Sequence, residues 1–324
     1  EMSCLMVNPV PYQNSILLTP QPFALRLIIL DEYDDMTDRL FDAVALVTGG
    51  SSGIGLGIAR ALSVRGATVL LADVDPNVFS TAKSLAEDTG GKVCSVSLDV
   101  SDPAHWNRVA NELVEDYGGI SILCNNAGIS TPRAPVGNYD IALWQKVMDV
   151  NLTGVFLGCS TLLSSMRLPG QKVRILNTAS VSGLFATPQL AAYTASKHGV
   201  LALSDAIRFE RKDENITVSV LCPGFVNTRI ASNSRNLAGE KRVGDAERLA
   251  MTDRLAHSMD PDTVGEIAIE GLLAEQPYIF THPEYSAVFE RRVAAIRPGF
   301  LANHGTGPQD DIHALGAAWL EIDG

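Results

Sequence analysis

An apolar run, Val44–Val47, leads directly into the glycine-rich segment Thr48–Gly55. The run predicts a buried strand, and the following residues predict a helix with apolar positions four apart at Ile54, Ile58 and Leu62. Glycines at positions 49, 53 and 55 allow a tight turn and a close approach of the backbone to a phosphate. The segment therefore predicts a strand–turn–helix unit that can bind a dinucleotide. An ordinary strand-to-helix connection remains an alternative for this segment alone.

Strand and helix patterns alternate along the chain. We expect strands near 43–48, 67–72, 93–98, 120–125, 172–178, 215–221 and 277–280. We expect helices near 53–65, 77–89, 104–117, 140–167, 191–212 and 262–274, and a last one that runs to about Ile296. The alternation predicts an α/β fold with a single Rossmann-type, doubly wound parallel sheet and helices on both faces. Ligands of such sheets bind beyond the carboxyl ends of the strands.

A chain of 324 residues could hold two domains. The functional segments extend from Thr48 to Thr228 and must meet at one site, so we predict one domain over residues 36–297. Residues 1–35 are expected to form a loosely ordered N-terminal extension, and residues 298–324 a C-terminal extension.

The second predicted strand ends in Asp73, about twenty residues past the glycine-rich turn. A carboxylate there can accept hydrogen bonds from both hydroxyls of an adenosine ribose, and it would repel a 2′-phosphate. No Arg or Lys stands at the neighbouring positions that could receive that phosphate, which are Ser51, Ser52, Ala72 and Val74. The sequence thus favours NAD over NADP. The alternative role of a helix cap suits Asp75 better, because Asp75 precedes Pro76.

Tyr193 and Lys197 lie one helical turn apart, and Ser180 precedes the tyrosine by thirteen residues. A close ammonium favours the phenolate and lowers the pKa of a phenol from its usual value of about 10. Tyr193 could then exchange a proton with an alcohol or a ketone near neutral pH, as a general acid or base must. Taken alone, the pair could equally be two surface residues. Asn151 stands inside an expected helix although asparagine is a poor residue for a helix interior.

Together these segments resemble the short-chain dehydrogenase/reductase family, in the subtype that the family's own naming calls classical. The resemblance covers roughly residues 40 to 290. The matching segments follow the family's order and spacing, and they are Thr48–Gly55, Asp73, Asp99-Val100, Asn125–Gly128, Asn151, Ser180, Tyr193-x-x-x-Lys197 and Pro223–Thr228.

The resemblance implies a role for each of four catalytic residues. Tyr193 would exchange the proton of the substrate hydroxyl or carbonyl, and Lys197 would lower the pKa of Tyr193 and bind the nicotinamide ribose. Ser180 would donate a hydrogen bond to the reacting oxygen, and Asn151 would hold a water that links Lys197 to solvent. The residues implied to bind the cofactor are Gly49, Ser51, Ser52, Gly53, Ile54, Gly55, Asp73, Asp99, Val100, Asn126, Ala127, Gly128, Tyr193, Lys197, Pro223, Gly224, Val226 and Thr228.

Within that set, Asp99 and Val100 would border the adenine, and Asn126 and Gly128 the adenosine ribose. Residues Pro223, Val226 and Thr228 would fix the nicotinamide carboxamide. The segment at about 227–260 breaks the strand and helix pattern, and the resemblance makes it a lid over the substrate. For residues 240–247 a disordered surface loop is the alternative.

Relatives of this family usually form tetramers, so the resemblance implies a homotetramer or a homodimer. The contact would involve the helices that carry Asn151 and the Tyr193–Lys197 pair. Apolar residues on these helices are compatible with such a contact and equally with core packing; they are Val155, Phe156, Val200, Leu201 and Leu203.

We expect an oxidoreductase that transfers a hydride between NAD and a secondary alcohol or ketone. The tail after Tyr278 is similar to that of relatives acting on bulky aromatic or alicyclic alcohols, so a bulky hydrophobic or aromatic small-molecule substrate is expected. One alternative is a carbonyl reductase, for instance of 3-oxoacyl thioesters, which Asp73 disfavours. A second is a non-catalytic dinucleotide sensor. Such proteins usually lose the tyrosine or the lysine, and all four catalytic residues are present here.

A net charge of −12 disfavours nucleic acid as a partner, because no basic patch can neutralise phosphates. The five cysteines and six histidines show no metal-ligand spacing, so no metal is expected. We predict reduced, buried thiols in a cytoplasmic protein. Residues 15–30 are fairly apolar, but Pro20, Pro22 and Arg26 interrupt them, so no membrane span is expected. No basic region precedes them, as a secretory signal would require.

Overall fold

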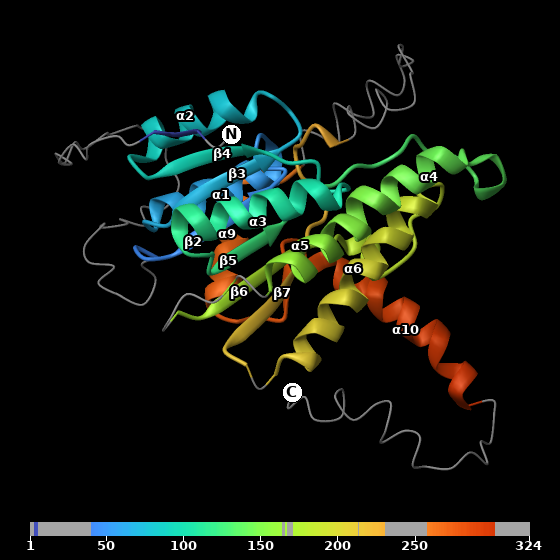
Figure 1. Ribbon diagram of the computed structural model, residues 1–324. Helices are drawn as coiled ribbons and strands as arrows, with labels where there is room; N and C mark the ends of the chain where they lie inside the picture. Colours follow the sequence, from blue (N-terminus) through green and yellow to red (C-terminus); the bar gives the residue numbers. More distant parts are fainter. Residues whose placement is uncertain are drawn as a thin grey trace, which may run out of the picture.

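The computed structural model describes residues 3–5, 40–163, 166, 171–212, 214–230 and 258–301. Most of the expected N-terminal extension, the expected lid from 231 to 257 and residues 302–324 lie outside the described residues. The described part has three layers, with helices on both faces of one sheet (Figure 1). This confirms the predicted fold class.

The sheet has eight strands in the order β1-β4-β3-β2-β5-β6-β7-β8. The chain builds outward from β2 through β3 and β4, and then in the other direction through β5 to β8. Strands β2 to β8 pair in parallel, as predicted. The reversal of strand order beside β2 opens a crevice at the carboxyl ends, which is where such sheets bind ligands. The strands are β1 (Ser3–Leu5), β2 (Val44–Thr48), β3 (Thr68–Asp73), β4 (Val93–Ser97), β5 (Ile122–Asn125), β6 (Val173–Thr178), β7 (Ile216–Cys222) and β8 (Tyr278–Phe280).

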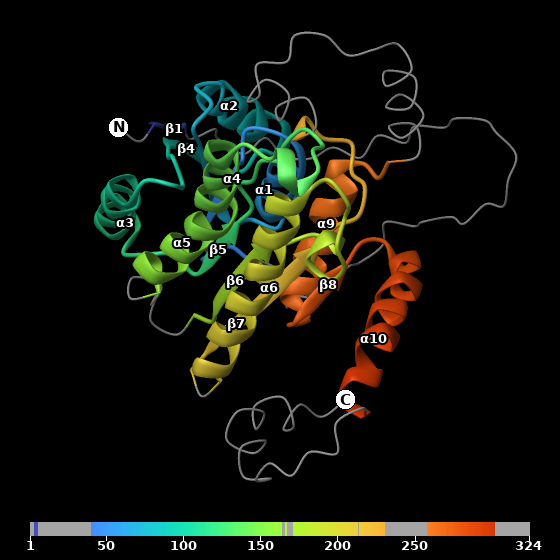
Figure 2. The same cartoon turned by 90° about the vertical axis from the view of Figure 1, so that its right-hand side faces the viewer.

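Two groups of helices cover the two faces of the sheet (Figure 2). One face carries α1 (Gly53–Val64), α2 (Val78–Thr89) and α9 (Pro261–Leu273). The other carries α3 (Pro103–Tyr117), α5 (Gly154–Leu162) and α6 (Ala191–Glu210). Alternate strand residues face opposite layers, so Leu46 and Leu70 pack toward α3, α5 and α6. Their neighbours Val47 and Leu71 pack toward α1, α2 and α9.

Aspartate side chains begin three of the helices. Asp102 accepts a hydrogen bond from the backbone N–H of Ala104 at 2.8 Å, and Pro103 follows as the first helical residue. Asp140 caps α4 (Ile141–Met148) and Asp260 caps α9 in the same way. These caps explain why the predicted starts of α3 and α9 lie within one residue of the observed ones.

A π-helical turn, Asp149–Thr153, joins α4 to α5, where the sequence predicted one helix over 140–167. The turn contains Asn151, the residue that had no explanation in an ordinary helix interior. Such widened turns are rare and occur frequently at functional sites. Three short 3₁₀ turns complete the described elements, at Val136–Asn138, Val181–Gly183 and Pro283–Tyr285.

The strand β1 was not predicted from the sequence. It pairs antiparallel with β4, in a register that sets Cys4 opposite Cys94. Cys94 is disulfide-bonded, so the prediction that all cysteines are reduced is wrong. That prediction overlooked a strand added at the edge of the sheet beside Cys94. The three cysteines 124, 159 and 222 are free and buried, as expected.

The last described helix, α10 (Ser286–Leu301), extends past its predicted end near Ile296. None of the helices in the described ranges is long and apolar enough to cross a membrane. The same ranges contain no cluster of three or more His, Cys, Asp or Glu side chains that could hold a metal ion.

Candidate active site

The predicted site residues meet at the carboxyl edge of the sheet. The glycine-rich turn follows β2, Asp73 ends β3, and Asn126 follows β5. Ser180 comes two residues after β6, and Pro223 directly after β7. Segments that are as much as 175 residues apart in the sequence, from 48 to 223, therefore border one region.

The glycine-rich turn is too tight for side chains at two positions. Gly49 has a positive φ of +66°, in the region that favours glycine. A Cβ atom on Gly55 would come within 2.2 Å of the Gly49 carbonyl oxygen. Ser52, at the start of α1, forms no side-chain cap. The N–H groups of the first helical turn therefore stay available to an anion.

The Asp73 carboxylate faces this turn. Its Oδ2 accepts hydrogen bonds from the backbone N–H of Ser51 at 3.1 Å and from the Ser51 hydroxyl at 2.5 Å. Its Oδ1 accepts one from the N–H of Asp75 at 3.0 Å. The carboxylate is thus fixed at the end of β3 with about one lone pair left over, on Oδ1, since two carboxylate oxygens can accept about four hydrogen bonds.

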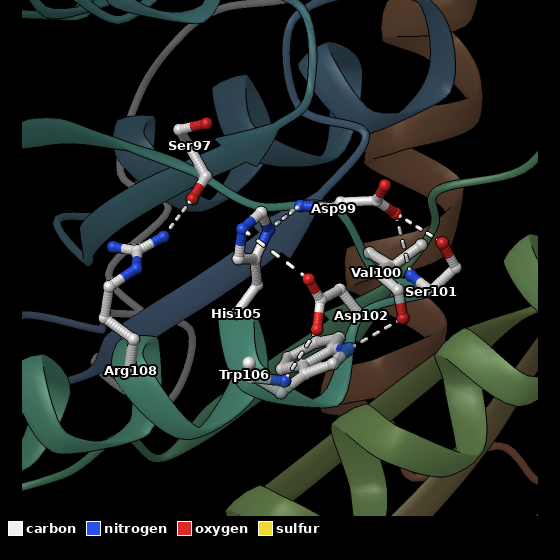
Figure 3. A network of polar contacts seen from close by, with 9 residues as sticks. Ser97, Asp99, Val100, Ser101, Asp102, His105, Trp106 and Arg108 are labelled. Carbon is white, nitrogen blue, oxygen red and sulfur yellow. Dashed lines mark hydrogen bonds and ion pairs between the residues drawn. The ribbon is translucent and has the colours of Figure 1, made fainter.

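Polar contacts hold the segment after β4 in one conformation (Figure 3). Asp99 accepts hydrogen bonds from the N–H and the hydroxyl of Ser101, at 2.9 and 2.6 Å. The indole N–H of the buried Trp106 donates to the Val100 carbonyl at 2.9 Å. Burial acts to raise the pKa of Asp99, but the bonds from Ser101 and the nearby His105 bring it below its usual value. Asp99 is therefore a stable carboxylate at neutral pH.

Asn126 ties three strand ends together. Its backbone N–H donates to the Thr48 hydroxyl at 2.9 Å, and its side-chain amide donates to the Thr48 carbonyl at 3.1 Å. The Ala127 N–H donates to the same hydroxyl at 3.0 Å. On the other side, the Thr178 hydroxyl donates to Asn126 Oδ1 at 3.4 Å. These bonds set the positions of the ends of β2, β5 and β6 relative to one another.

Lys197 is buried in α6, with 3% of its surface exposed. Its ammonium donates a hydrogen bond to the Thr178 carbonyl at 2.7 Å and lies 5.8 Å from the centre of the Tyr193 ring. Burial lowers the pKa of Lys197 from 10.5 to about 8, because a desolvated ammonium is unfavourable. The two side chains are neighbours on one helix face, as their spacing predicted.

The sequence led us to expect a lowered pKa for Tyr193, and the opposite direction is found. Burial raises the pKa of the Tyr193 phenol above its usual value, and only the hydrogen bond with the Ser180 side chain acts in the other direction. Tyr193 is therefore a neutral phenol at neutral pH.

Asn151 lies fully buried beside this pair. Its Oδ1 accepts from the Ile129 N–H at 2.8 Å, and its Nδ2 donates to the Ile129 carbonyl at 2.9 Å. The Nδ2 also donates to the Ser196 hydroxyl at 3.1 Å, which in turn donates to the Tyr193 carbonyl at 2.8 Å. The π turn thus connects the segment after β5 to the helix that carries Tyr193. A Cβ on Gly128 would lie 3.4 Å from Asn151 Oδ1 and 3.5 Å from the lysine Nζ.

The segment after β7 forms the remaining border of the site. The Ser180 hydroxyl donates to the Pro223 carbonyl at 3.4 Å. The Gly224 N–H donates to Nδ1 of His282 at 3.2 Å. Further along, the Thr228 methyl would lie 3.1 Å from a Cβ on Gly53, so this segment reaches the glycine-rich turn.

Four residues of this network were not among the predicted site residues: Thr48, Thr178, Ser196 and His282. Thr48 and Thr178 each occupy the last position of a strand, and Ser196 precedes Lys197. Their positions, at a strand end or next to Lys197, could have marked these three as site residues. No comparable signal marks His282, because its contact with Gly224 joins two distant segments.

Comparison with known proteins agrees with this geometry. A family model described as "short chain dehydrogenase" matches residues 43–238. The chain is 36% identical to a 3-alpha-(or 20-beta)-hydroxysteroid dehydrogenase of Mycobacterium tuberculosis, over 60% of this chain and 72% of that protein. It is 41% identical to a protein named as ketoacyl reductase 1 of the granaticin polyketide synthase of Streptomyces violaceoruber, over 63% of this chain and 75% of that one.

Among solved structures, a short-chain dehydrogenase/reductase from Burkholderia phymatum, in complex with NAD, superposes with a TM-score of 0.71. It is 30% identical to this chain and covers 83% of it, and 98% of its own chain is matched. The family match, the sheet order and the cluster of site residues all agree, and this chain belongs to the short-chain dehydrogenase family of oxidoreductases.

Proposed function

We propose that this short-chain dehydrogenase oxidises a bulky, hydrophobic or aromatic secondary alcohol with NAD. The observation that carries the proposal is the catalytic cluster at the end of β6. There the Tyr193 phenol interacts with Ser180, Lys197 is its buried neighbour, and Asn151 connects to the same helix turn. These are the groups that proton exchange with an alcohol or ketone needs.

The residues present fit a dinucleotide. The turn from Gly49 to Gly55 is a cradle that a Cβ atom would fill, and the N-terminus of α1 favours a pyrophosphate there. The fixed carboxylate of Asp73 would accept a hydrogen bond from a ribose hydroxyl, which favours NAD over NADP. When bound, NAD supplies the hydride chemistry.

The position of Gly128 alters one detail of the expected arrangement. It lies beside Asn151 and Lys197, so we assign it to the nicotinamide ribose rather than to the adenosine ribose. Asp99 and Val100, held by Ser101 and Trp106, would border the adenine. The remaining expected contacts, from Pro223, Gly224, Val226 and Thr228 to the nicotinamide carboxamide, are retained in the proposal.

Proton movement is the task of this chain's own residues. Tyr193 gives its proton to a ketone oxygen, or takes one from an alcohol after losing its own. Ser180 donates to the same oxygen, where negative charge develops. We propose that Lys197 and a water held by Asn151 pass the proton onward. Because burial raises the pKa of Tyr193, alcohol oxidation is expected to speed up as the pH rises.

Aromatic residues near Ser180 support a bulky substrate. Phe185, five residues after Ser180, stacks on Tyr285 with a centroid distance of 5.8 Å. His282 lies 6.1 Å from the same tyrosine ring. The hydroxysteroid dehydrogenase relative also acts, by its name, on a large alicyclic alcohol.

A carbonyl reductase is the second candidate. The neutral phenol that burial favours at Tyr193 is the acid form that ketone reduction requires. The relative named as a ketoacyl reductase is consistent with this reading.

Location and assembly stay proposals. The free thiols at 124, 159 and 222 support a cytoplasmic location, whereas the disulfide at Cys94 argues against it. For a tetramer or dimer through α5, Phe156 is the best candidate contact, because it is 52% exposed. Val155, Val200 and Leu201 are buried in the core.

The test is a steady-state assay with NAD and NADP, in both directions, across aromatic, steroid and terpenoid alcohols and their ketones. Tyr193→Phe should lower turnover by about 10²–10⁴-fold, the usual contribution of a general acid or base, while NADH binding survives. Tyr117→Phe, which also loses one phenol hydroxyl but lies on α3, is the matched control and should keep its activity. Near-normal turnover in Tyr193→Phe would refute the catalytic assignment.

A further inference from the structure

The helix α10 projects from the body of the molecule (Figures 1 and 2). Every residue from 286 to 300 is exposed, including the apolar side chains Phe289 and Val293, which are 38 and 36% exposed. Isolated helices of about 15 residues are marginal in water, and most helices in proteins depend on packing of an apolar face. A projecting helix with these side chains therefore needs a partner surface.

One face of α10 forms a groove lined by Phe289, Glu290, Val293, Ala294, Arg297 and Pro298. The side chain of Arg292 marks the opposite face, because it donates a hydrogen bond to the Leu184 carbonyl on the body. At about 100° per residue, Glu290 and Arg297 stand roughly 160° and 140° around the helix from Arg292. The groove thus faces away from the rest of the subunit.

The order of residues in this groove is self-complementary. Consider a second copy of α10 laid antiparallel, with a two-fold axis between Val293 and Ala294. Val293 then faces the partner's Ala294, and Glu290 faces the partner's Arg297. The same symmetry sets Phe289 opposite the partner's Pro298. Two symmetry-equivalent ion pairs would flank an apolar centre, and the small Ala294 would allow a close approach.

We propose that the groove on α10 is a two-fold contact between two copies of this chain, with their α10 helices paired antiparallel. Such an interface uses the same patch on both subunits, which is how most soluble homo-oligomers associate. A helix of 16 residues is about 24 Å long, so the contact is at the small end of stable interfaces and should depend on concentration.

The experiment is sedimentation velocity of the full chain over roughly 1–100 µM, a range suited to a small interface. Val293→Glu places a carboxylate at the apolar centre and should halve the mass of whatever assembly the unchanged protein forms. Val293 is partly exposed, so this variant should fold, and a thermal melt checks that it does.

Charge reversal tests the register. Glu290→Arg and Arg297→Glu each set like charges opposite one another and should raise the dissociation constant of this contact by about tenfold, equal to about 1.4 kcal/mol. The double variant Glu290→Arg/Arg297→Glu restores opposite charges and should return to within about threefold of the unchanged protein. Glu115→Arg, on the exposed side of α3, is the control for the added charge.

Two results would overturn the proposal. One is an equal mass for Val293→Glu and the unchanged protein at every concentration. The other is a double variant that associates no better than the two single variants, since only the antiparallel two-fold pairing predicts the rescue.

Discussion

The glycine-rich turn and the catalytic cluster lie at the same edge of the sheet but are built in opposite ways. The turn consists of backbone packed so closely that a Cβ on Gly55 would come 2.2 Å from a carbonyl oxygen. The cluster instead buries ionisable side chains, and burial moves the pKa of Lys197 down and that of Tyr193 up. Packing in the turn contributes to stability, whereas desolvation in the cluster costs stability. Substitutions in the glycine-rich turn should therefore lower the free energy of unfolding. Replacing a buried ionisable side chain of the cluster should raise it.

The largest effect is expected at Lys197. Its folded-state pKa of about 8 lies about 2.5 units below 10.5, and each unit corresponds to about 1.36 kcal/mol. Between these two values the unfolded chain holds a proton that the folded chain has lost, so the free energy of unfolding rises with pH. The Lys197→Met variant lacks the titrating group. This rise in the free energy of unfolding, up to about 3 kcal/mol, should therefore be missing in the variant.

The measurement is urea unfolding of both proteins at several pH values from 7 to 10. The stability advantage of Lys197→Met over the unchanged protein should be greatest near pH 7 and shrink as the pH rises. Lys83→Met removes a lysine whose side chain is 62% exposed, and it should leave the pH dependence unaltered. Parallel curves for Lys197→Met and the unchanged protein would contradict the cost assigned to this ammonium.

In the glycine-rich turn we expect Gly55→Ala to destabilise the protein by about 1–3 kcal/mol, the usual cost of overpacking. The added methyl group would meet backbone, at the Gly49 carbonyl, and cannot be accommodated by a side-chain rotation. The turn must shift, so NADH binding should be lost as well. Thermal unfolding and an NADH fluorescence titration measure the two effects.

Gly137→Ala is the matched control, because a Cβ there would meet no atom within 4 Å. Its stability should change by no more than about 0.5 kcal/mol. If the two alanine variants melted at the same temperature, close packing would not be what fixes the turn.

Removing the Asp73 carboxylate, which joins the turn to the end of β3, should have a smaller effect than Gly55→Ala. Hydrogen bonds to a charged group contribute about 1.5–3 kcal/mol, so Asp73→Ala should weaken NAD binding by about 10–100-fold. It should also reduce the discrimination against NADP. Ser51→Ala removes only the hydroxyl partner of the carboxylate and should weaken NAD binding a few-fold. Equal cofactor preference before and after Asp73→Ala would rule out the ribose assignment.

The two regions also differ in how far the sequence predicts them. The turn, Asp73 and the Tyr193–Lys197 pair depend on spacing within a strand, a turn or a helix, and the sequence places them correctly. The raised pKa of Tyr193 depends on burial, which arises only when distant segments meet. The π turn at Asn151, the strand β1 and the exposed face of α10 were likewise missed, because neighbours far along the sequence decide them.

The smallest effect, at His282, tests one of these long-range contacts. Nδ1 of this residue accepts the Gly224 N–H at 3.2 Å and lies 2.6 Å from the Thr281 hydroxyl. An asparagine side chain can set an oxygen acceptor near the place of Nδ1, whereas glutamine reaches the place of Nε2. His282→Asn should therefore keep the turn after β7 in place and leave the KM for the alcohol nearly unchanged. His282→Gln should raise that KM by about 2–10-fold, as expected for the loss of one neutral hydrogen bond. Both variants lose the imidazole, so equal KM values for the two would mean that the acceptor does not position Gly224.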